Sequence, residues 1–186
     1  MGFFLPPDAR ILMLGSFPPP KERWSMNFYY PNFINDMWRI MGMVFFGDKD
    51  YFILRERRAF DEEKIRAFCL SKGIALGDTA VEIIRLNDNA SDKFLEVVKP
   101  IELEKILAQI SLCHTIVITG QKAMDTFLSV TDIREPKIGS SSELDFAGRK
   151  IKVCRMPSSS RAYPVKLEEK VAIYRSMFAK AEMKLA

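Results

Sequence analysis

The chain has 186 residues, of which 48% are hydrophobic and 28% are charged, a balance typical of one globular domain. No apolar run reaches the roughly 18 residues that a membrane-spanning helix needs, and the start, MGFFLPPDAR, lacks the basic and long apolar parts of a signal peptide. The net charge of +4 permits nucleic acid as a partner without requiring it. We therefore expect a single domain over residues 1–186 that is monomeric, cytoplasmic and not attached to a membrane.

Apolar strands alternate with amphipathic helices along the chain. In chain order, the predicted elements are a strand at 10–15, helices at 35–45 and 61–73, a strand at 74–78, a helix at 102–112, a strand at 115–120, a helix at 121–130, a hairpin at 143–157 and a helix at 166–185. Buried strands joined by helices predict an α/β fold whose mainly parallel sheet is covered on both faces.

The cysteines and the histidine give little support for a metal or redox site. Cys69, Cys113 and Cys154 are widely separated, and no pair has C-x-x-C spacing. The single histidine, His114, directly precedes the apolar run TIVIT, which favours a position at the start of a strand over a role as a zinc ligand or triad member. We therefore expect no metal and no cofactor.

Three unusual segments follow predicted strands, at the edge of the sheet where ligands bind in folds of this kind. They are GSFPPP…NDMW, GDTAVEIIRLNDNASD and RMPSSSRAYP. The first combines a glycine that permits close approach, stiff prolines, flat aromatic rings and amide groups. A single asparagine there could be only a helix cap. The combination instead favours a pocket for a planar heterocycle.

The segment MPSSSRAYP offers hydroxyl, amide and guanidinium donors between two prolines. Such groups suit DNA phosphates, with Ser158, Ser159, Ser160 and Arg161 as the candidate contacts. The simpler alternative is a polar loop that caps the final helix.

Taken together, GSFPPP…FYYPNFINDMW and MPSSSRAYP resemble the uracil-DNA glycosylase superfamily, and most closely its hypoxanthine-DNA glycosylase-like branch. That branch has a G-S-x-P opening, a Tyr-Tyr pair, an asparagine three residues before a tryptophan, and a late Pro-Ser-x-Ser loop. The resemblance implies a three-layer α/β/α fold with a short, mainly parallel four-stranded sheet. It also implies a DNA-repair enzyme that flips a damaged base of the uracil or hypoxanthine type into a pocket and hydrolyses its N-glycosidic bond.

The resemblance also assigns roles to residues. Asn35 would be the catalytic group that positions water, and Asp36 could itself act as a base. The residues implied to hold the base are Gly15, Ser16, Phe17, Pro18, Tyr29, Tyr30 and Asn89. The residues implied to bind DNA are Pro157, Ser158, Ser159, Ser160 and Arg161.

The sequence departs from the family pattern at several positions. Phe33-Ile34 replaces the usual Pro-Arg, Asp36 stands where a small residue is common, and Thr119 stands where many relatives have an asparagine that reads the base edge. Asn89 and Gln121 are the two candidates to substitute for that asparagine. Two alternative functions therefore remain open: an inactive or weakly active nucleic-acid-binding member of the fold, and a small-molecule or nucleotide hydrolase that uses the same crevice.

Overall fold

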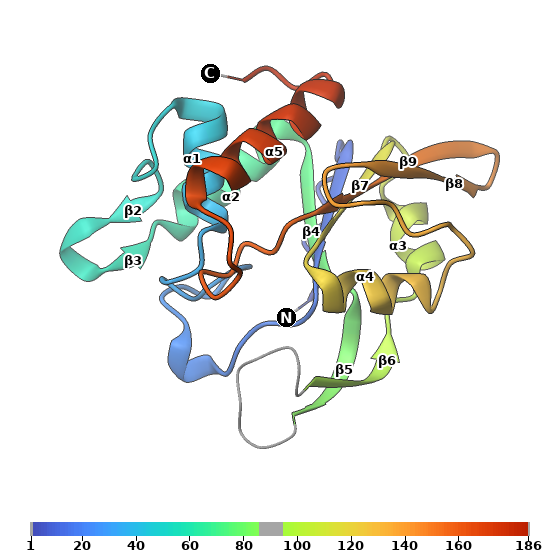
Figure 1. Ribbon diagram of the computed structural model, residues 1–186, viewed down its shortest axis with the longest axis horizontal. Coiled ribbons are helices and arrows are strands. Elements are labelled where there is room, and N and C mark those ends of the chain that lie inside the picture. The colour runs from blue at the N-terminus through green and yellow to red at the C-terminus, as the bar shows by residue number, and fades with distance from the viewer. Residues whose placement is uncertain (1, 86–94, 186) are drawn as a thin grey trace.

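The computed structural model describes residues 2–85 and 95–185 and has a three-layer α/β/α architecture (Figure 1). In these residues the central sheet has five strands in the order β4-β1-β7-β9-β8. Strands β4, β1, β7 and β9 are parallel, and β8 is antiparallel to β9. Their carboxyl ends therefore lie together at one edge of the sheet, and this edge carries the site described below.

The bounds of the elements agree with the alternation predicted from the sequence. The central strands are β4 Ile74–Asp78, β1 Ile11–Gly15, β7 Thr115–Thr119, β9 Arg149–Met156 and β8 Ser141–Phe146. The α-helices are α1 Met37–Phe46, α2 Glu62–Lys72, α3 Leu103–Gln109, α4 Gln121–Leu128 and α5 Leu167–Lys180. The short elements are the 3-10 turns η1 Lys21–Arg23 and η2 Arg55–Arg57 and the strands β2 Ile53–Leu54 and β3 Ala59–Phe60.

Alternate residues of the buried strands form two separate cores, because successive side chains of a strand point to opposite faces. Ile11 and Met13 of β1 pack with α1, α2 and α5 on one face. Leu12 and Leu14 pack with α3 and α4 on the other face. Figure 1 shows the two groups of helices on opposite sides of the sheet.

Two features differ from the prediction. The hairpin expected at 143–157 is present, but its first arm, β8, joins the sheet and makes five strands instead of four. The region after β4, for which no strands were predicted, forms a two-stranded antiparallel ribbon of β5 Ala80–Arg85 and β6 Leu95–Pro100. Most side chains of this ribbon are exposed or half-buried, so it lacks the continuous apolar pattern of a core strand.

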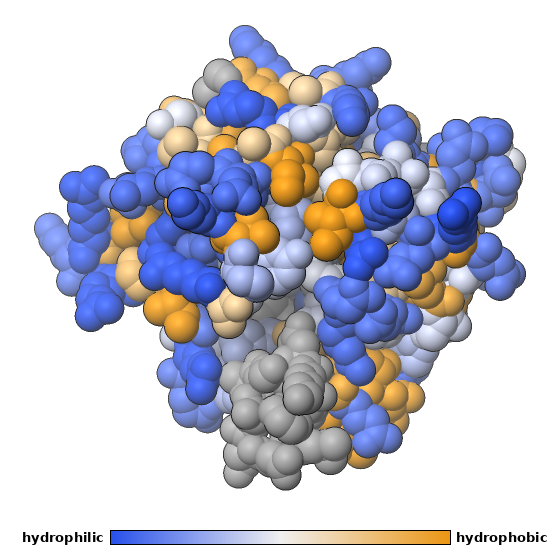
Figure 2. All heavy atoms as spheres, in the orientation of Figure 1, coloured by the Kyte–Doolittle hydropathy of each residue, from blue (hydrophilic) through white to orange (hydrophobic). Residues whose placement is uncertain are grey.

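Among the described residues, no helix is both long and apolar enough to cross a membrane. On the face seen in Figure 2, hydrophilic side chains predominate and hydrophobic residues occur in scattered groups.

Candidate functional site

A cavity of about 570 Å³ opens at the carboxyl ends of β1, β4 and β7. This volume falls within the roughly 300–1,000 Å³ typical of small-molecule sites. Its walls come from the loop after β1, the segment that leads into α1, and the ends of β4 and β7. The remaining wall is the loop after β9 that contains Ser158, Ser159 and Ser160, called the serine loop. The lining residues are Gly15, Ser16, Phe17, Pro18, Pro19, Arg23, Tyr29, Tyr30, Pro31, Asn32, Ile34, Asn35, Asp78, Thr119, Ser158, Ser159, Ser160, Arg161, Ala162, Tyr163 and Pro164.

The proline-rich wall of the cavity is fixed from two directions. The indole N–H of Trp24 donates to the carbonyl of Pro19 at 2.7 Å. The guanidinium of Arg85, from ribbon strand β5, donates to the carbonyl of Pro18 at 2.5 Å. Proline fixes its own φ angle, and these bonds hold the intervening carbonyls, so the wall is rigid.

Tyr30 and Thr119 both line the cavity and are hydrogen-bonded to each other. The Thr119 hydroxyl donates to the carbonyl of Leu14 at 3.2 Å, so the Tyr30 hydroxyl, 2.9 Å away, must donate to Thr119. Burial raises the pKa of the Tyr30 hydroxyl, and the nearby carboxylate of Asp78 raises it further, although the bond to Thr119 opposes the shift. Tyr30 therefore stays neutral and keeps its proton at physiological pH.

Asn35 lies at the start of α1 with its amide in a defined orientation. Its Oδ1 accepts the backbone N–H of Met37 at 2.8 Å. Because only the oxygen of an amide can accept from an N–H, this bond fixes which side of the group carries the Nδ2 donors. An amide oxygen has two lone pairs, so Oδ1 can still accept a hydrogen from a water molecule.

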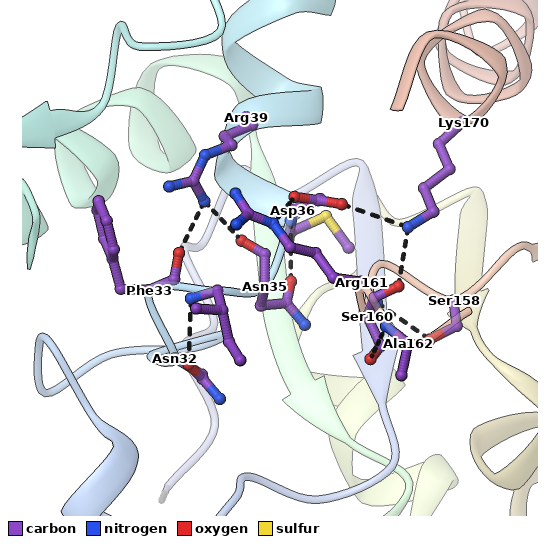
Figure 3. A network of polar contacts seen from close by, with 12 residues as sticks. Asn32, Phe33, Asn35, Asp36, Arg39, Ser158, Ser160, Arg161, Ala162 and Lys170 are labelled. Carbon is purple, nitrogen blue, oxygen red and sulfur yellow. Dashed lines mark hydrogen bonds and ion pairs between the residues drawn. The ribbon is translucent and has the colours of Figure 1, made fainter. Parts of the chain in front are cut away.

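Asp36 is a buried carboxylate behind the cavity wall and belongs to an ion-pair network (Figure 3). Its Oδ1 accepts from Nε of Arg161 at 2.9 Å, and its Oδ2 lies 3.4 Å from Nζ of Lys170. The Asp36 residue is 6% exposed and is not among the lining residues. Both oxygens of its carboxylate thus face cations.

The serine loop is joined directly to the segment that carries Asn35. Asn35 and Ser160 form an isolated antiparallel bridge, and the N–H of Asp36 donates to the carbonyl of Ser159 at 2.9 Å. The hydroxyl oxygens of Ser158 and Ser160 accept the N–H groups of Ser160 and Ala162, each at 3.2 Å. A hydroxyl that accepts still has a hydrogen to donate, so both serines can offer O–H groups to an anion.

The structure brings most of the predicted site residues around one cavity, although they come from opposite ends of the chain. The predicted residues that line it are Gly15, Ser16, Phe17, Pro18, Tyr29, Tyr30, Asn35, Ser158, Ser159, Ser160 and Arg161.

Four other candidates are placed differently. Asp36 and Pro157 lie behind the cavity wall, and the carbonyl of Pro157 accepts the hydroxyl of the buried Tyr174 at 3.0 Å. Gln121 is exposed and bonds to Asp125, away from the lining residues. Asn89 lies outside the described residues.

Sequence reasoning missed two charged residues of the cavity. Asp78 ends β4 and pairs in register with Gly15, and a Cβ placed on Gly15 would lie 3.1 Å from Asp78 Oδ1. Arg23, at the end of η1, is an exposed cation at the rim. The signal for Asp78 was its position after the buried strand IALG, the same kind of position that pointed to Gly15.

The sequence matches no protein-family profile and no curated protein. Comparison with solved structures finds the solution NMR structure of a protein provisionally named a uracil DNA glycosylase, from Methanosarcina acetivorans. The two chains are 21% identical and superpose with a TM-score of 0.62, over 95% of this chain and 96% of the other. The likeness thus spans nearly the whole of both chains, and the present protein has a uracil-DNA glycosylase-like fold.

Proposed function

We propose that this protein is a DNA glycosylase of the uracil-DNA glycosylase superfamily, and that it hydrolyses the N-glycosidic bond of a deaminated base flipped out of DNA. The observation that carries the proposal is the union of two distant segments around one cavity. Asn35 and the aromatic residues come from the loop after β1, and the hydroxyl-rich Ser158–Ser160 loop bridges to Asn35 itself. The wall proposed to hold the base and the rim proposed to bind phosphates are therefore joined through the backbone bridge between Asn35 and Ser160.

Flipping explains why the site needs both parts. The bond to be cut cannot be reached inside the duplex, so the base must leave the stack, and a damaged or mismatched base costs least to unstack. Phe17 and Tyr30 line the cavity, and aromatic rings of this kind can stack on the extruded base. The hydroxyls of Ser158 and Ser160, with Arg161 and Arg23, offer donors to the flanking phosphates.

In the reaction a bond forms from water to C1′ of the sugar, and the bond from C1′ to the base breaks with its electron pair leaving on the base. The proton that the water loses passes to bulk solvent, because the amide of Asn35 orients the water but does not take its proton. Positive charge builds on the sugar and negative charge builds on the base. Asn35 Oδ1, held by the Met37 N–H, accepts a hydrogen from the attacking water and directs its oxygen toward C1′. The DNA phosphates beside the sugar stabilise its positive charge.

Asp78 favours hypoxanthine as the base. Deamination of adenine or cytosine turns a ring nitrogen that accepts hydrogen bonds into an N–H that donates one. A carboxylate attracts the N–H of the deaminated base and repels the lone pair of the parent base. It also opposes a base that leaves as an anion, whereas a purine that first takes up a proton from solvent on its five-membered ring can leave neutral. We therefore infer that hypoxanthine is released faster than uracil.

The test is a panel of otherwise identical duplexes that carry hypoxanthine, uracil, xanthine, mismatched thymine or an undamaged base. Abasic sites are scored under single-turnover conditions. We expect cleavage of hypoxanthine first and uracil second, with none of adenine or cytosine. Tight, salt-dependent binding without release of any base would identify a binding protein instead. Failure to bind any duplex would favour a small-molecule hydrolase.

Replacement of Arg161 by Ala should weaken binding by a similar factor for all duplexes, because a guanidinium at the rim contacts phosphates rather than base edges. The slope of log Kd against log salt concentration should fall by about one, since one phosphate contact is lost. Titration of two unrelated duplexes at several salt concentrations measures both effects. Arg55→Ala is the matched control, since Arg55 is an exposed arginine in an ion pair outside the cavity lining. A loss of affinity confined to one sequence would show that Arg161 reads bases.

Base release should be equally fast in EDTA and in Mg²⁺, because the proposed chemistry uses an amide, hydroxyls and a carboxylate. Among residues 2–85 and 95–185, no group of three His, Cys, Asp or Glu side chains could hold a metal ion. The measurement is the single-turnover rate after exhaustive dialysis against chelator. Loss of activity that added metal restores would contradict the mechanism.

A further inference from the structure

Lys170 is a buried cation next to the site. It lies near the start of α5, is 1% exposed, and is not among the residues that line the cavity. Its ammonium donates to the carbonyl of Ser160 at 2.8 Å and to Oδ2 of Asp36 at 3.4 Å. A buried charge is costly unless it is paired and hydrogen-bonded. Because Lys170 is buried outside the cavity lining, we expect it to act on Asp36 and Ser160 and not to contact DNA.

These two partners belong to the two segments that meet at Asn35. Ser160 forms the backbone bridge with Asn35, and Asp36 is the N-cap residue of α1, whose first residue, Met37, donates its N–H to Asn35 Oδ1. The Lys170 ammonium therefore holds the serine loop against the start of α1, and we call this contact between the two segments the junction. Figure 3 shows Lys170 reaching from its helix toward Asp36 and Ser160, with Asn35 on the other side of that junction.

Asp36 has a second cation, and its two partners differ in exposure. The Arg161 side chain is 49% exposed, whereas the Lys170 side chain is 1% exposed. Arg161 lines the cavity and Lys170 does not. If Arg161 moves from Asp36 to a phosphate, Lys170 still neutralises the carboxylate, and no buried charge is left unpaired.

We propose that Lys170 is a positioning residue that holds Asn35 through Asp36 and Ser160, and that Arg161 is the exchangeable partner of Asp36, free to move to a DNA phosphate while Lys170 keeps the junction closed. The inference rests on the proposed function for its effect on catalysis. Its structural part, the closure of the junction by Lys170, can be tested without DNA.

The first measurement is amide hydrogen exchange in the free protein. Lys170→Met keeps the length of the side chain and removes the charge. It should accelerate exchange of the N–H groups of Asp36 and Met37 at least tenfold, because both are bonded across the junction or to Asn35. Lys170→Arg should restore much of the protection. Lys180→Met, at the exposed C-terminal end of the same helix, is the matched control and should change neither amide.

The second measurement is single-turnover base release with saturating DNA, well below the melting temperature. Lys170→Met should slow release by about 10-fold or more, since a small misplacement of a positioning group can cost up to about 10²-fold, and Kd should change less than about threefold. In an Asn35→Ala background, Lys170→Met should have no further effect on rate, because it acts through Asn35. An equal further loss in that background would indicate only a general structural role.

The outcomes separate this inference from the proposed function. If wild-type protein releases no base from any duplex, the proposed function fails, and amide exchange still tests the junction. If Lys170→Met is folded and the Asp36 and Met37 amides exchange as in wild type, the inference is overturned whatever the activity. If Lys170→Met does not fold, the double variant Asp36→Asn/Lys170→Met, which removes both buried charges, takes its place. If the Asp36 and Met37 amides of the double variant exchange as in wild type, the inference is likewise overturned.

Discussion

Replacement of Asn35 by Ala should lower the single-turnover rate of base release by about 10²–10³-fold while lesion DNA binds within about threefold of wild type. Loss of one group that stabilises or positions the reacting atoms costs about this much in other enzymes. The amide of Asn35 makes no phosphate contact in the proposed complex, so affinity should be spared. Rapid-quench assays with excess enzyme, together with titration of a non-cleavable duplex, measure the two quantities separately.

The variant also removes a helix cap, and this effect must be separated from chemistry. Asn35 Oδ1 accepts the Met37 N–H, and loss of such a cap costs about 1 kcal/mol of stability. Asn35→Ser retains a capping oxygen on a shorter side chain, so it should melt close to wild type and still be slow. Asn35→Asp retains both the bond to the Met37 N–H and an oxygen that can hold water. It should therefore keep more activity than Asn35→Ala or Asn35→Ser.

The competing assignment gives the chemistry to Asp36 and leaves Asn35 as a cap. It predicts that Asn35→Ala lowers the melting temperature and spares turnover. It also predicts that Asp36→Ala abolishes turnover, and this variant lowers the melting temperature as well because it leaves the buried Lys170 without its carboxylate partner. The Asp36 carboxylate faces Arg161 and Lys170 and lies behind the cavity wall, which favours a positioning role for it. A fully active Asn35→Ala protein would remove the central residue of the proposed mechanism.

The layers of the fold could be predicted from the sequence because their signals are local. Continuous apolar runs such as ILML and TIVI are what a strand buried on both faces requires, and both lie in the central sheet. Gly73 after a helical pattern predicted a C-cap, and it has the left-handed φ of 63° that such a cap uses. The ribbon β5–β6 has no such signal, because its side chains are mostly exposed and its pairing is irregular near Ala80.

The site could be predicted only in part, because its connections join residues far apart in the chain. The run GSFPPP and the serine loop were conspicuous by composition, and both line the cavity. The bond from Tyr30 to Thr119 spans 89 positions, and the pair of Lys170 with Asp36 spans 134. In the sequence Lys170 follows two glutamates of an amphipathic helix and reads as a surface residue; only the packing of α5 buries it.

Asp78 offers the sharpest test of which base the cavity accepts. It lies at the end of β4 beside Gly15, and its carboxylate is close enough to Tyr30 to raise the pKa of that hydroxyl. Asp78→Ala should slow release of hypoxanthine by about 10–10²-fold, since a hydrogen bond to a charged group is worth about 1.5–3 kcal/mol. Asp78→Asn keeps an oxygen that can accept the N–H but loses the charge, so its loss should be about tenfold.

Uracil should respond differently to the same variants. Its N–H also meets the carboxylate, but its departure as an anion is opposed by that charge, and the two effects offset each other in the transition state. The ratio of hypoxanthine to uracil release should therefore fall in Asp78→Asn, while binding to a duplex with an abasic-site analogue, which has no base to contact, should stay the same. Asp145→Asn, on the exposed side of β8, is the matched control. Two outcomes would contradict this role: an unchanged ratio of hypoxanthine to uracil release, or a loss of affinity for the abasic duplex as large as that for the hypoxanthine duplex. Either would show that Asp78 supports the structure at the carboxyl edge of the sheet and does not select the base.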